Sequence, residues 1–474
     1  MAHTFYWHDY ETSGINPGQD RPMQFAGIRT DSELNVCGDP LRLYCQLPPD
    51  VLPHPLACAV TGISPQTANS LGVSEREFIA AIHAEMMQPG TCSVGYNSIR
   101  FDDEFTRFTL YRNFHDAYER EYRNGNSRWD LIDVARLCCA LRPDDIVWPK
   151  GLDGKPSFRL ELLSEANGIQ HEDAHDALSD VLATIEFAKL IKQRKPKLFD
   201  YALQLRNKRF VAGLLDTAKG EPLLHVSSKL PAEHFCSTLV LPVAKHPTNS
   251  NGVVCVDLRN DPQPLLDLPA LELRRLLFLS SDQRGADTPR IPLKTIHLNR
   301  SPMVATAKLL DEPLSKRLQL DFNACNEHAQ QLLGDTSWVS KLQTVFELDD
   351  DQSHRDVDAA LYGGGFFSDA DRTLMQDVRR SSADELANQE FAFEDPRLDE
   401  LLFRYRARNF PDSLSFQEQS KWLQHCKNKH VNEGGFTFEE FRAELESART
   451  NGASPELIIA LEQYAIGLSE TLDV

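Results

Sequence analysis

The sequence lacks the features of a membrane, secreted or thiolate-metal protein. No apolar run approaches the length of a membrane-spanning helix. The opening MAHTFYWHDYET has no basic stretch followed by an apolar one, as a secretory signal would have. The ten cysteines occur without CxxC pairs or zinc-ligand spacing. We therefore expect a cytoplasmic protein that makes no membrane contact and whose cysteines are reduced thiols filling the core.

An excess of positive charge is also missing. The chain has 50 Lys and Arg against 70 Asp and Glu, a formal net charge of −20 at pH 7. General adhesion to nucleic acid is excluded, because such binding depends on cations that neutralise phosphates. One local exception is residues 189–209, which carry eight Lys and Arg against a single Asp. This segment fits either a nucleic-acid contact or a solvated helix end followed by a linker.

The length and the pattern of apolar residues predict several domains. A chain of 474 residues corresponds to about three domains at roughly 150 residues each. Short strand-like runs at 5–12, 23–30 and 41–47 come first, and helical periodicity follows at 76–87 and 175–193. This alternation is typical of an α/β layer fold.

The later part of the chain changes character twice. Residues 222–305 consist of short apolar runs between turn residues, which predicts a small β barrel or sandwich. An acidic stretch at 347–358 is interpreted as a linker. Helical periodicity then returns at 369–380, 396–410 and 454–470, so we expect an all-α C-terminal region.

Acidic residues form a candidate metal site. Asp9 and Glu11 are two apart on the first predicted strand, so both carboxylates project from the same face. Two adjacent carboxylates repel each other unless cations neutralise them, and Mg²⁺ prefers such oxygen ligands. An isolated D-x-E pair is common, however, and carries little information alone.

Two further groups follow in the chain. Asp102 and Asp103 come after a Gly-Tyr-Asn turn and open a predicted helix, where acids often cap the helix; we interpret Asp103 and Glu104 in that way. His175 precedes Asp180 by five residues, and five residues differ by about 140° on an ideal helix. We therefore expect His175 at the helix entrance or on the preceding loop, from which it could reach a site held by Asp180.

In this order, Asp9, Glu11, Asp102, Asp180 and His175 resemble the signature of the DEDD exonucleases of the histidine subtype. The segment VTGISPQTA resembles a stretch typical of that superfamily. Longer motifs resemble bacterial exonuclease I along the whole chain: HDYETSG, FAGIRTDSELNV, GYNSIRFDDEFTR, YRNFHDAY, NSRWDLIDVARL, PSFRLELLSEANGI, AHDALSDVLAT, FFSDADR and YRARNFP.

The resemblance implies a three-domain fold. A ribonuclease H-like α/β exonuclease domain is expected at 1–195, an SH3-like β domain at 196–349 and a helical C-terminal domain at 352–474. In this family the three domains surround single-stranded DNA, which implies a monomer. The α/β, β, α order is the same as the one predicted from the apolar pattern alone.

The resemblance also implies an activity. It is the 3′→5′ exonucleolytic release of nucleoside monophosphates from single-stranded DNA by two-metal hydrolysis, in DNA repair and recombination. The metal ligands would be Asp9, Glu11, Asp102 and Asp180, with Asp9 bridging two Mg²⁺ ions; Mn²⁺ is the alternative metal. His175 would be the general base, since its ordinary pKa of about 6.5 lies near working pH.

The substrate and partner residues come from the resemblance as well. Besides Glu11, it implies substrate contacts by three arginines and three tyrosines: Arg107, Arg136, Arg159, Tyr118, Tyr122 and Tyr201. Tyr118 and Tyr122 fit the spacing of core aromatics on a helix equally well. The family also binds the acidic tail of single-stranded DNA-binding protein in a basic pocket. Residues 323–338 contain no Lys or Arg, so that pocket is expected to be weakened or displaced.

Two other functions remain open at this point. A noncatalytic DNA-binding or scaffold protein could keep the fold, although it would have no need for clustered carboxylates. A ribonuclease of the same superfamily would share the catalytic residues. Metal-dependent activity and a comparison of DNA with RNA ends separate these alternatives.

Overall fold

The structure is a computed structural model that describes residues 3–171, 176–280, 282–285, 288–347, 356–432 and 435–474. The chain forms two compact units. No helix among the described residues is long and apolar enough to cross a membrane. The first unit comprises Met1–Ser127, His171–Ile185 and Gln352–Val474, and the second comprises Arg128–Gln170 and Glu186–Asp351.

Strands β3, β2, β1 and β4, in this order within a five-stranded sheet that ends with β5, organise the first unit. The central strand β1 pairs antiparallel with β2 and parallel with β4. The parallel pair needs a crossover, and the chain between β2 and β4 supplies it with three helices. The strands are β1 (Thr4–Thr12), β2 (Pro22–Thr30), β3 (Leu41–Tyr44), β4 (Thr91–Gly95) and β5 (Ser127–Asp130).

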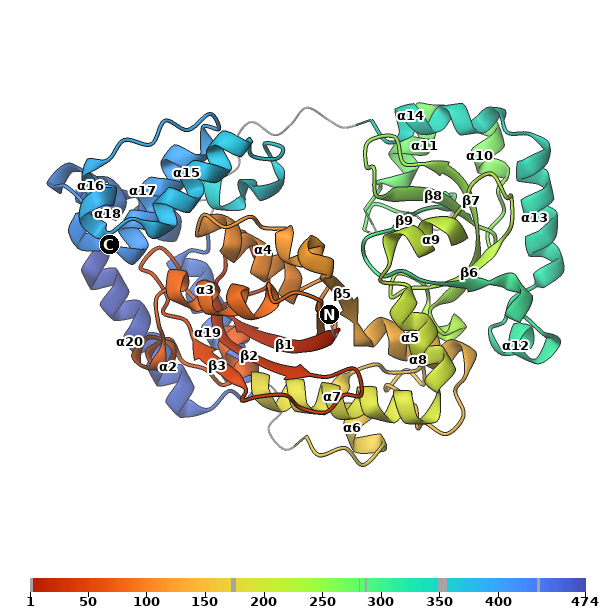
Figure 1. Cartoon of the computed structure of the whole chain (residues 1–474), viewed down its shortest axis with the longest axis horizontal. Coiled ribbons are helices and arrows are strands. Elements are labelled where there is room, and N and C mark those ends of the chain that lie inside the picture. Colours follow the sequence, from red (N-terminus) through yellow and green to blue (C-terminus); the bar gives the residue numbers. More distant parts are fainter. Residues whose placement is uncertain (1–2, 172–175, 281, 286–287, 348–355, 433–434) are drawn as a thin grey trace. The chain divides into compact units, whose positions relative to one another are not determined.

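Helices α3 (Glu75–Met86) and α4 (Asp102–Arg112) pack on one face of this sheet (Figure 1). Tyr6 and Tyr10 of β1 enter a core with Phe78 of α3 and Leu110 of α4. Because side chains alternate along a strand, Asp9 and Glu11 project from the other face of β1. Helices α1 (Pro55–Thr61), α2 (Pro65–Leu71) and the beginning of α7 (Ala177–Arg194) complete this part.

The C-terminal helices pack against this α/β part in two separate cores. In one, Phe441 and Leu461 lie with Met23 and Cys58. In the other, Met375 and Leu401 lie with Phe108 and Tyr111 of α4. The helices are α15 (Asp369–Arg380), α16 (Ala383–Asn388), α17 (Arg397–Asn409), α18 (Phe416–Val431), α19 (Phe438–Thr450) and α20 (Pro455–Leu472).

The second unit contains an antiparallel sheet with the order β10-β6-β7-β8-β9. Its strands are β6 (Leu223–Val226), β7 (Ser237–Lys245), β8 (Gly252–Asp257), β9 (Leu293–His297) and β10 (Met303–Thr306). Its helices are α5 (Leu131–Leu141), α6 (Leu160–Ala166), α8 (Pro196–Gln204), α9 (Lys208–Leu214), α10 (Gln263–Asp267), α11 (Ala270–Leu277), α12 (Glu312–Arg317), α13 (Phe322–Gly334), α14 (Leu342–Val345) and the rest of α7.

The predicted fold class is confirmed, with one local difference. The α/β, β and all-α regions occur in the expected order, and α8 begins at the predicted break before Pro196. Helices α10 and α11 lie between β8 and β9, inside the stretch 222–305 for which a small β barrel or sandwich was predicted. The three domain boundaries remain predictions, and most of the proposed linker at 347–358 lies outside the described residues.

Buried charges connect the C-terminal helices to the sheet. Arg408 of α17 has an exposed side-chain fraction of only 4% and donates to Asp50 at 2.7 Å and to Asp358 at 2.9 Å. Arg21 approaches Asp358 at 3.5 Å and Glu75 at 3.5 Å, and its own side chain is fully buried. Burial alone would raise the pKa of Asp358, yet Arg408 holds it well below its usual range. The network is therefore ionised and paired.

We predict that Asp358→Ala lowers the free energy of unfolding by about 3–5 kcal/mol, because it leaves buried guanidinium groups without a counter-charge. Urea denaturation followed by circular dichroism measures the change. Arg449→Met is the matched control, since Arg449 and Glu462 form an exposed pair at 2.6 Å that should contribute only about 0–1 kcal/mol. Equal losses in the two variants would contradict a special role for the buried network.

Candidate metal centre and active site

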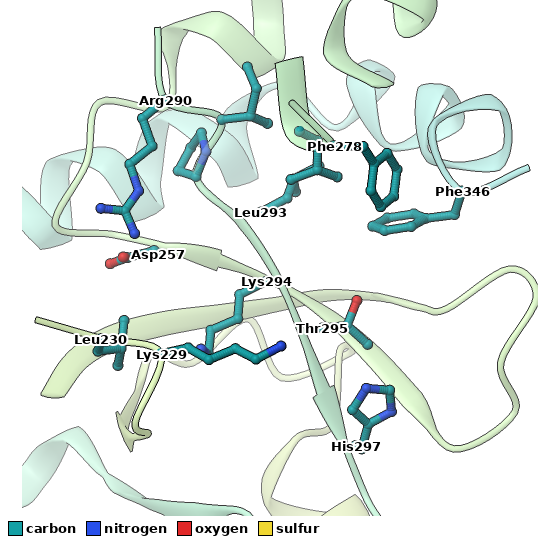
Figure 2. A pocket seen from close by; sticks show the side chains of 13 residues that line it. Lys229, Leu230, Asp257, Phe278, Arg290, Leu293, Lys294, Thr295, His297 and Phe346 are labelled. Atoms are coloured by element: carbon teal, nitrogen blue, oxygen red, sulfur yellow. The ribbon is translucent and has the colours of Figure 1, made fainter. Parts of the chain in front are cut away.

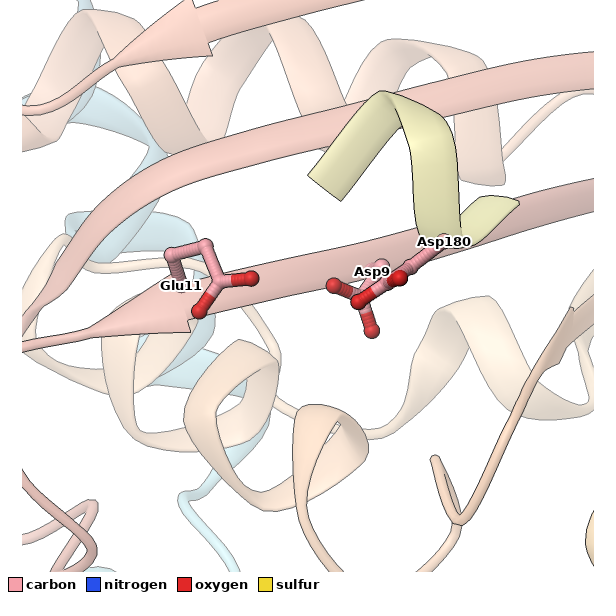
Figure 3. A group of neighbouring side chains, drawn as sticks. All are labelled: Asp9, Glu11 and Asp180. Atoms are coloured by element: carbon pink, nitrogen blue, oxygen red, sulfur yellow. The ribbon is translucent and has the colours of Figure 1, made fainter. Parts of the chain in front are cut away.

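Three carboxylates converge at the sheet of the first unit. Oxygen atoms of Asp9, Glu11 and Asp180 all lie within 4.8 Å of one another. Figure 3 shows Asp9 and Glu11 on the same strand, with Asp180 approaching from a helix. Glu11 is buried, while Asp9 and Asp180 are partly exposed. The period-two prediction for Asp9 and Glu11 is thus confirmed, and a residue about 170 positions later in the chain joins them.

Asp102 lies next to this group. It begins α4, is buried, and its Oδ1 accepts a hydrogen bond from the backbone amide of Tyr10 at 3.1 Å. That amide lies between Asp9 and Glu11 in β1, so the hydrogen bond joins the beginning of α4 to the strand that carries both acids. Asp102 also raises the pKa of Asp9 and of Glu11.

The electrostatics of the group favour bound cations. Burial, followed by the charges of Asp102, Glu11 and Asp180, raises the pKa of Asp9 well above its usual range. Burial and the charge of Asp180 raise the pKa of Glu11 to about 9. Neighbouring carboxylates without a counter-charge retain protons for this reason. The donor set fits hard divalent cations such as Mg²⁺, which bind carboxylate oxygens and keep positions for water and phosphate.

The beginning of α7, which carries Asp180, is attached to the sheet by side chains that the sequence did not indicate. The Gln24 side chain, on β2 opposite Glu11, accepts from the amide of Ala177 at 3.3 Å and donates to Tyr44 at 2.9 Å. Asp176 accepts from the amides at the start of α7 and pairs with Arg42 of β3. These contacts depend on pairing between strands, which single-sequence periodicity does not show.

The predicted base and an unpredicted histidine lie near one another in sequence. His175 lies outside the described residues. His171 contacts Asp180 through Nε2, and its side chain is 4% exposed. Its other ring nitrogen, Nδ1, is buried and has no hydrogen-bond partner among the residues that the structure describes. The sequence analysis missed His171, although a second histidine four residues before His175 was a visible signal.

Asp103 and Glu104 lie in the first turn of α4, as expected for acids at the beginning of a helix, and the N-cap residue Phe101 makes no side-chain cap hydrogen bond. Asp103 is buried and accepts from Arg120 at 2.6 Å. Glu104 accepts from Arg107 at 2.7 Å. Asp103 pairs with Arg120 because the chain after α4 returns over its first turn, whereas Glu104 pairs with Arg107 one turn along α4 itself.

The predicted DNA-path residues of the first unit differ in their accessibility. Arg107 is 5% exposed and donates to Glu121 at 2.7 Å, and its guanidinium carbon lies 5.4 Å from the centre of the Tyr118 ring. Tyr118 and Tyr122 flank a short 3₁₀ turn and do not share an α-helix. Tyr122 is 66% exposed. Only Tyr122 therefore presents a free ring surface.

The predicted DNA-path residues of the second unit also differ. Arg159 is 69% exposed and pairs with Glu161 at 3.2 Å. Arg136 is 9% exposed and pairs with Asp133 at 2.8 Å. The Tyr201 hydroxyl donates to the carbonyl of Val304 at 2.8 Å. Arg159 is thus the most accessible cation of the predicted set.

Comparison with known proteins agrees with this geometry. Residues 6–188 match the family model described as exonuclease, and with the carboxylate group they define an exonuclease domain. Residues 206–348 match the exonuclease I SH3-like domain, and residues 355–468 match the exonuclease I C-terminal domain. The chain belongs to the exonuclease I family.

Relatives and solved structures cover nearly the whole chain. An exodeoxyribonuclease I of Haemophilus influenzae is 44% identical over 98% of both chains. The structure of a moderately thermophilic exonuclease I from Methylocaldum szegediense matches with a TM-score of 0.92 at 47% identity, covering 98% of this chain and 99% of that one. The zinc-bound Escherichia coli exonuclease I complex with single-stranded DNA matches with a TM-score of 0.93 at 43% identity, covering 99% and 100%.

We predict that the metal-free protein becomes less stable as pH rises. The pKa of Glu11 is higher in the folded state, about 9, than its ordinary value of 4.5. The folded state therefore holds a proton that the unfolded state has lost, and stability falls across this range. The melting temperature in EDTA should decrease between about pH 5.5 and about pH 8.5, and Mg²⁺ should raise it most at the higher pH.

Glu11→Gln should reduce this pH dependence, since the amide does not titrate. Replacement of the exposed Glu390 by Gln should leave it unchanged. A pH dependence that is the same in Glu11→Gln as in the unaltered protein would show that Glu11 does not hold the proton.

We also predict that His171→Ala weakens metal binding. Residues that orient a metal ligand typically contribute about 10–100-fold to metal affinity, and His171 contacts Asp180 directly. The Mn²⁺ concentration that gives half of the maximal thermal stabilisation should rise by about that factor. His3→Ala, at an exposed histidine, is the control. An unchanged Mn²⁺ midpoint would exclude a positioning role for His171.

Proposed function

We propose that this chain is a metal-dependent exodeoxyribonuclease that shortens single-stranded DNA from its 3′ end and releases nucleoside 5′-monophosphates, in DNA repair and recombination. The observation that supports it most directly is the carboxylate group of Asp9, Glu11 and Asp180, in a chain 44% identical to an exodeoxyribonuclease I over almost its entire length. A noncatalytic scaffold would bear the electrostatic cost of these acids without any use for them.

The metals proposed are two Mg²⁺ ions, with Mn²⁺ as the alternative. Asp9 would contribute to both positions, and Glu11, Asp102 and Asp180 would complete the ligands. When bound, the two ions stabilise the charge on the attacking and leaving oxygens of the scissile phosphate. The raised pKa values of Asp9 and Glu11 support this assignment, because cations would restore the ionised forms of both groups.

The proton-transfer residue proposed is His175. It follows His171 by four residues and precedes Asp180 by five, so it is close in sequence to one member of the carboxylate group. As general base it would take a proton from the attacking water. Its replacement by Ala should lower kcat more than it raises KM.

The substrate path proposed keeps the residues implied by the family resemblance and divides them by accessibility. Arg159 and Tyr122 are exposed and can contact phosphate and base directly. Arg107 and Arg136 are already paired with carboxylates, so they would have to exchange a carboxylate for a phosphate. Tyr118 and Tyr201 are partly buried and would present only part of their rings.

Further parts of the proposal rest on family resemblance. They are the three domains at 1–195, 196–349 and 352–474, a monomeric state, a cytoplasmic location and docking of the single-stranded DNA-binding protein tail. For that partner the structure offers a limited argument. Residues 322–334 form helix α13, which contains no Lys or Arg, so a basic pocket for an acidic tail would have to lie elsewhere.

The experiment is digestion of a 5′-labelled single-stranded oligodeoxynucleotide with Mg²⁺, with EDTA, and by the Asp9→Ala variant. We expect metal-dependent shortening from the 3′ end. Asp9→Ala should abolish it, because the two proposed metal positions would lose the ligand that they share. Duplex DNA and RNA of the same sequence are the controls. Preferential shortening of RNA would make the protein a ribonuclease, and DNA binding without shortening would make it a scaffold.

A further inference from the structure

A cavity of about 360 Å³ opens in the second unit, between β9 and the segments that surround it. Its volume falls within the usual range of small-ligand sites. Figure 2 shows two kinds of lining: the side chains of Lys229, Lys294 and Arg290 on one part, and the rings of Phe278 and Phe346 on another. None of these residues belongs to the carboxylate group or to the predicted DNA path.

The cationic part of the cavity lacks counter-charges. In the described part of the chain, no carboxylate forms an ion pair with Lys229, Arg290 or Lys294. Asp257 also lines the cavity, but its Oδ1 accepts from the Thr238 hydroxyl at 2.5 Å and from the amide of Arg259 at 3.2 Å. That carboxylate is therefore engaged within the fold.

Lys294 shows the effect of this crowding. Its Nζ donates a long hydrogen bond of 3.4 Å to the Ser227 hydroxyl. Burial, followed by the charge of Lys229 and, more weakly, that of Arg290, lowers the pKa of Lys294 to about 8, against opposing effects of Asp257 and Cys255. An anion in the cavity would stabilise the charged form of Lys294 and offset the repulsion among the three cations.

The aromatic part of the cavity is suited to a planar ring. Phe278 is 64% exposed, whereas Phe346, 6.3 Å away between ring centres and almost perpendicular, is 9% exposed. Phe346 thus supports Phe278 from one side and leaves its remaining surface free. Exposed aromatic rings beside cations are the usual means of holding a nucleobase and its phosphate together.

We propose that this cavity is an accessory nucleotide-binding site, in which Lys229, Arg290 and Lys294 hold a phosphate and Phe278 stacks on the base. The ligand chemistry is a 5′-phosphorylated nucleoside, either free or as one unit of a DNA strand. The choice of a nucleotide rests on the proposed function, whose product and substrate are these two forms. The cavity is separate in residues from the carboxylate group, so the two sites can be tested independently.

The test is isothermal titration of the full-length Asp9→Ala protein with dTMP, thymidine, inorganic phosphate and a short oligothymidylate, all in EDTA. EDTA leaves the carboxylate site without cations, so that it repels phosphate. We expect dTMP or the oligothymidylate to bind, and thymidine to bind at least about tenfold more weakly because it lacks the charged group.

Three exposed positions provide the variants. Lys229→Ala combined with Arg290→Ala should weaken binding of both nucleotide and inorganic phosphate by about tenfold or more. Phe278→Ala should weaken nucleotide binding by about fivefold or more and leave inorganic phosphate unaffected. Arg275→Ala, an exposed arginine of α11 that pairs with Glu272 outside the cavity, is the matched control and should change neither.

If the variants weaken the binding of dTMP, the ligand is the free nucleotide. If only the oligothymidylate binds and the variants weaken its binding, the ligand is a DNA strand. Absence of binding, or binding that the variants do not change, would overturn the proposal. Digestion by the unaltered protein with Mg²⁺ tests the proposed function, and titration in EDTA tests the cavity, so the failure of one proposal can be told from the failure of the other.

Discussion

The structure of the first unit depends on pairing charges that are buried away from water. Asp50 and Asp358 are fully buried, and each is held by Arg408 of α17. Arg21 follows the turn between β1 and β2, and Arg112 ends α4, where it donates to Glu75 at 2.8 Å. The network therefore includes residues of α4, which carries Asp102, and of the turn that follows β1, which carries Glu11. Removing one partner would leave an uncompensated buried charge. The pairing therefore favours this arrangement of β1, α4 and α17 over arrangements that would separate the charges.

The candidate metal centre uses the opposite principle. There burial and the neighbouring charges of the same sign raise the pKa values of Asp9 and Glu11. A few residues away, Asp103 and Glu104 have the same chemistry but are neutralised by arginine. An acid that pairs with an arginine has a structural role, whereas an acid without such a pair is available to a metal. The position of the nearest guanidinium therefore separates the two kinds of acid. The accessory cavity shows the same imbalance with positive charge.

The sequence allowed much of the site to be predicted and missed its supporting contacts. Alternation along β1 identified Asp9 and Glu11, and the ordered motifs identified Asp102 and Asp180. Gln24 and Arg42 were not found, because their contacts with the start of α7 join elements far apart in the chain. His171 was missed although it precedes Asp180 by only nine residues. The cavity beside Lys294 was not found either, since Lys229 and Arg290 are 61 residues apart and line one cavity only in the folded chain.

The sequence by itself determined the order of α/β, β and α regions, the shared face of Asp9 and Glu11, and the family, because periodicity and motifs are local properties of the chain. Only the tertiary structure decided which charges are paired. Burial changes the cost of a charge, and burial depends on every element that packs around it. Arg107 illustrates this: its sequence suggests a phosphate contact, and the fold places it against Glu121 and Glu104.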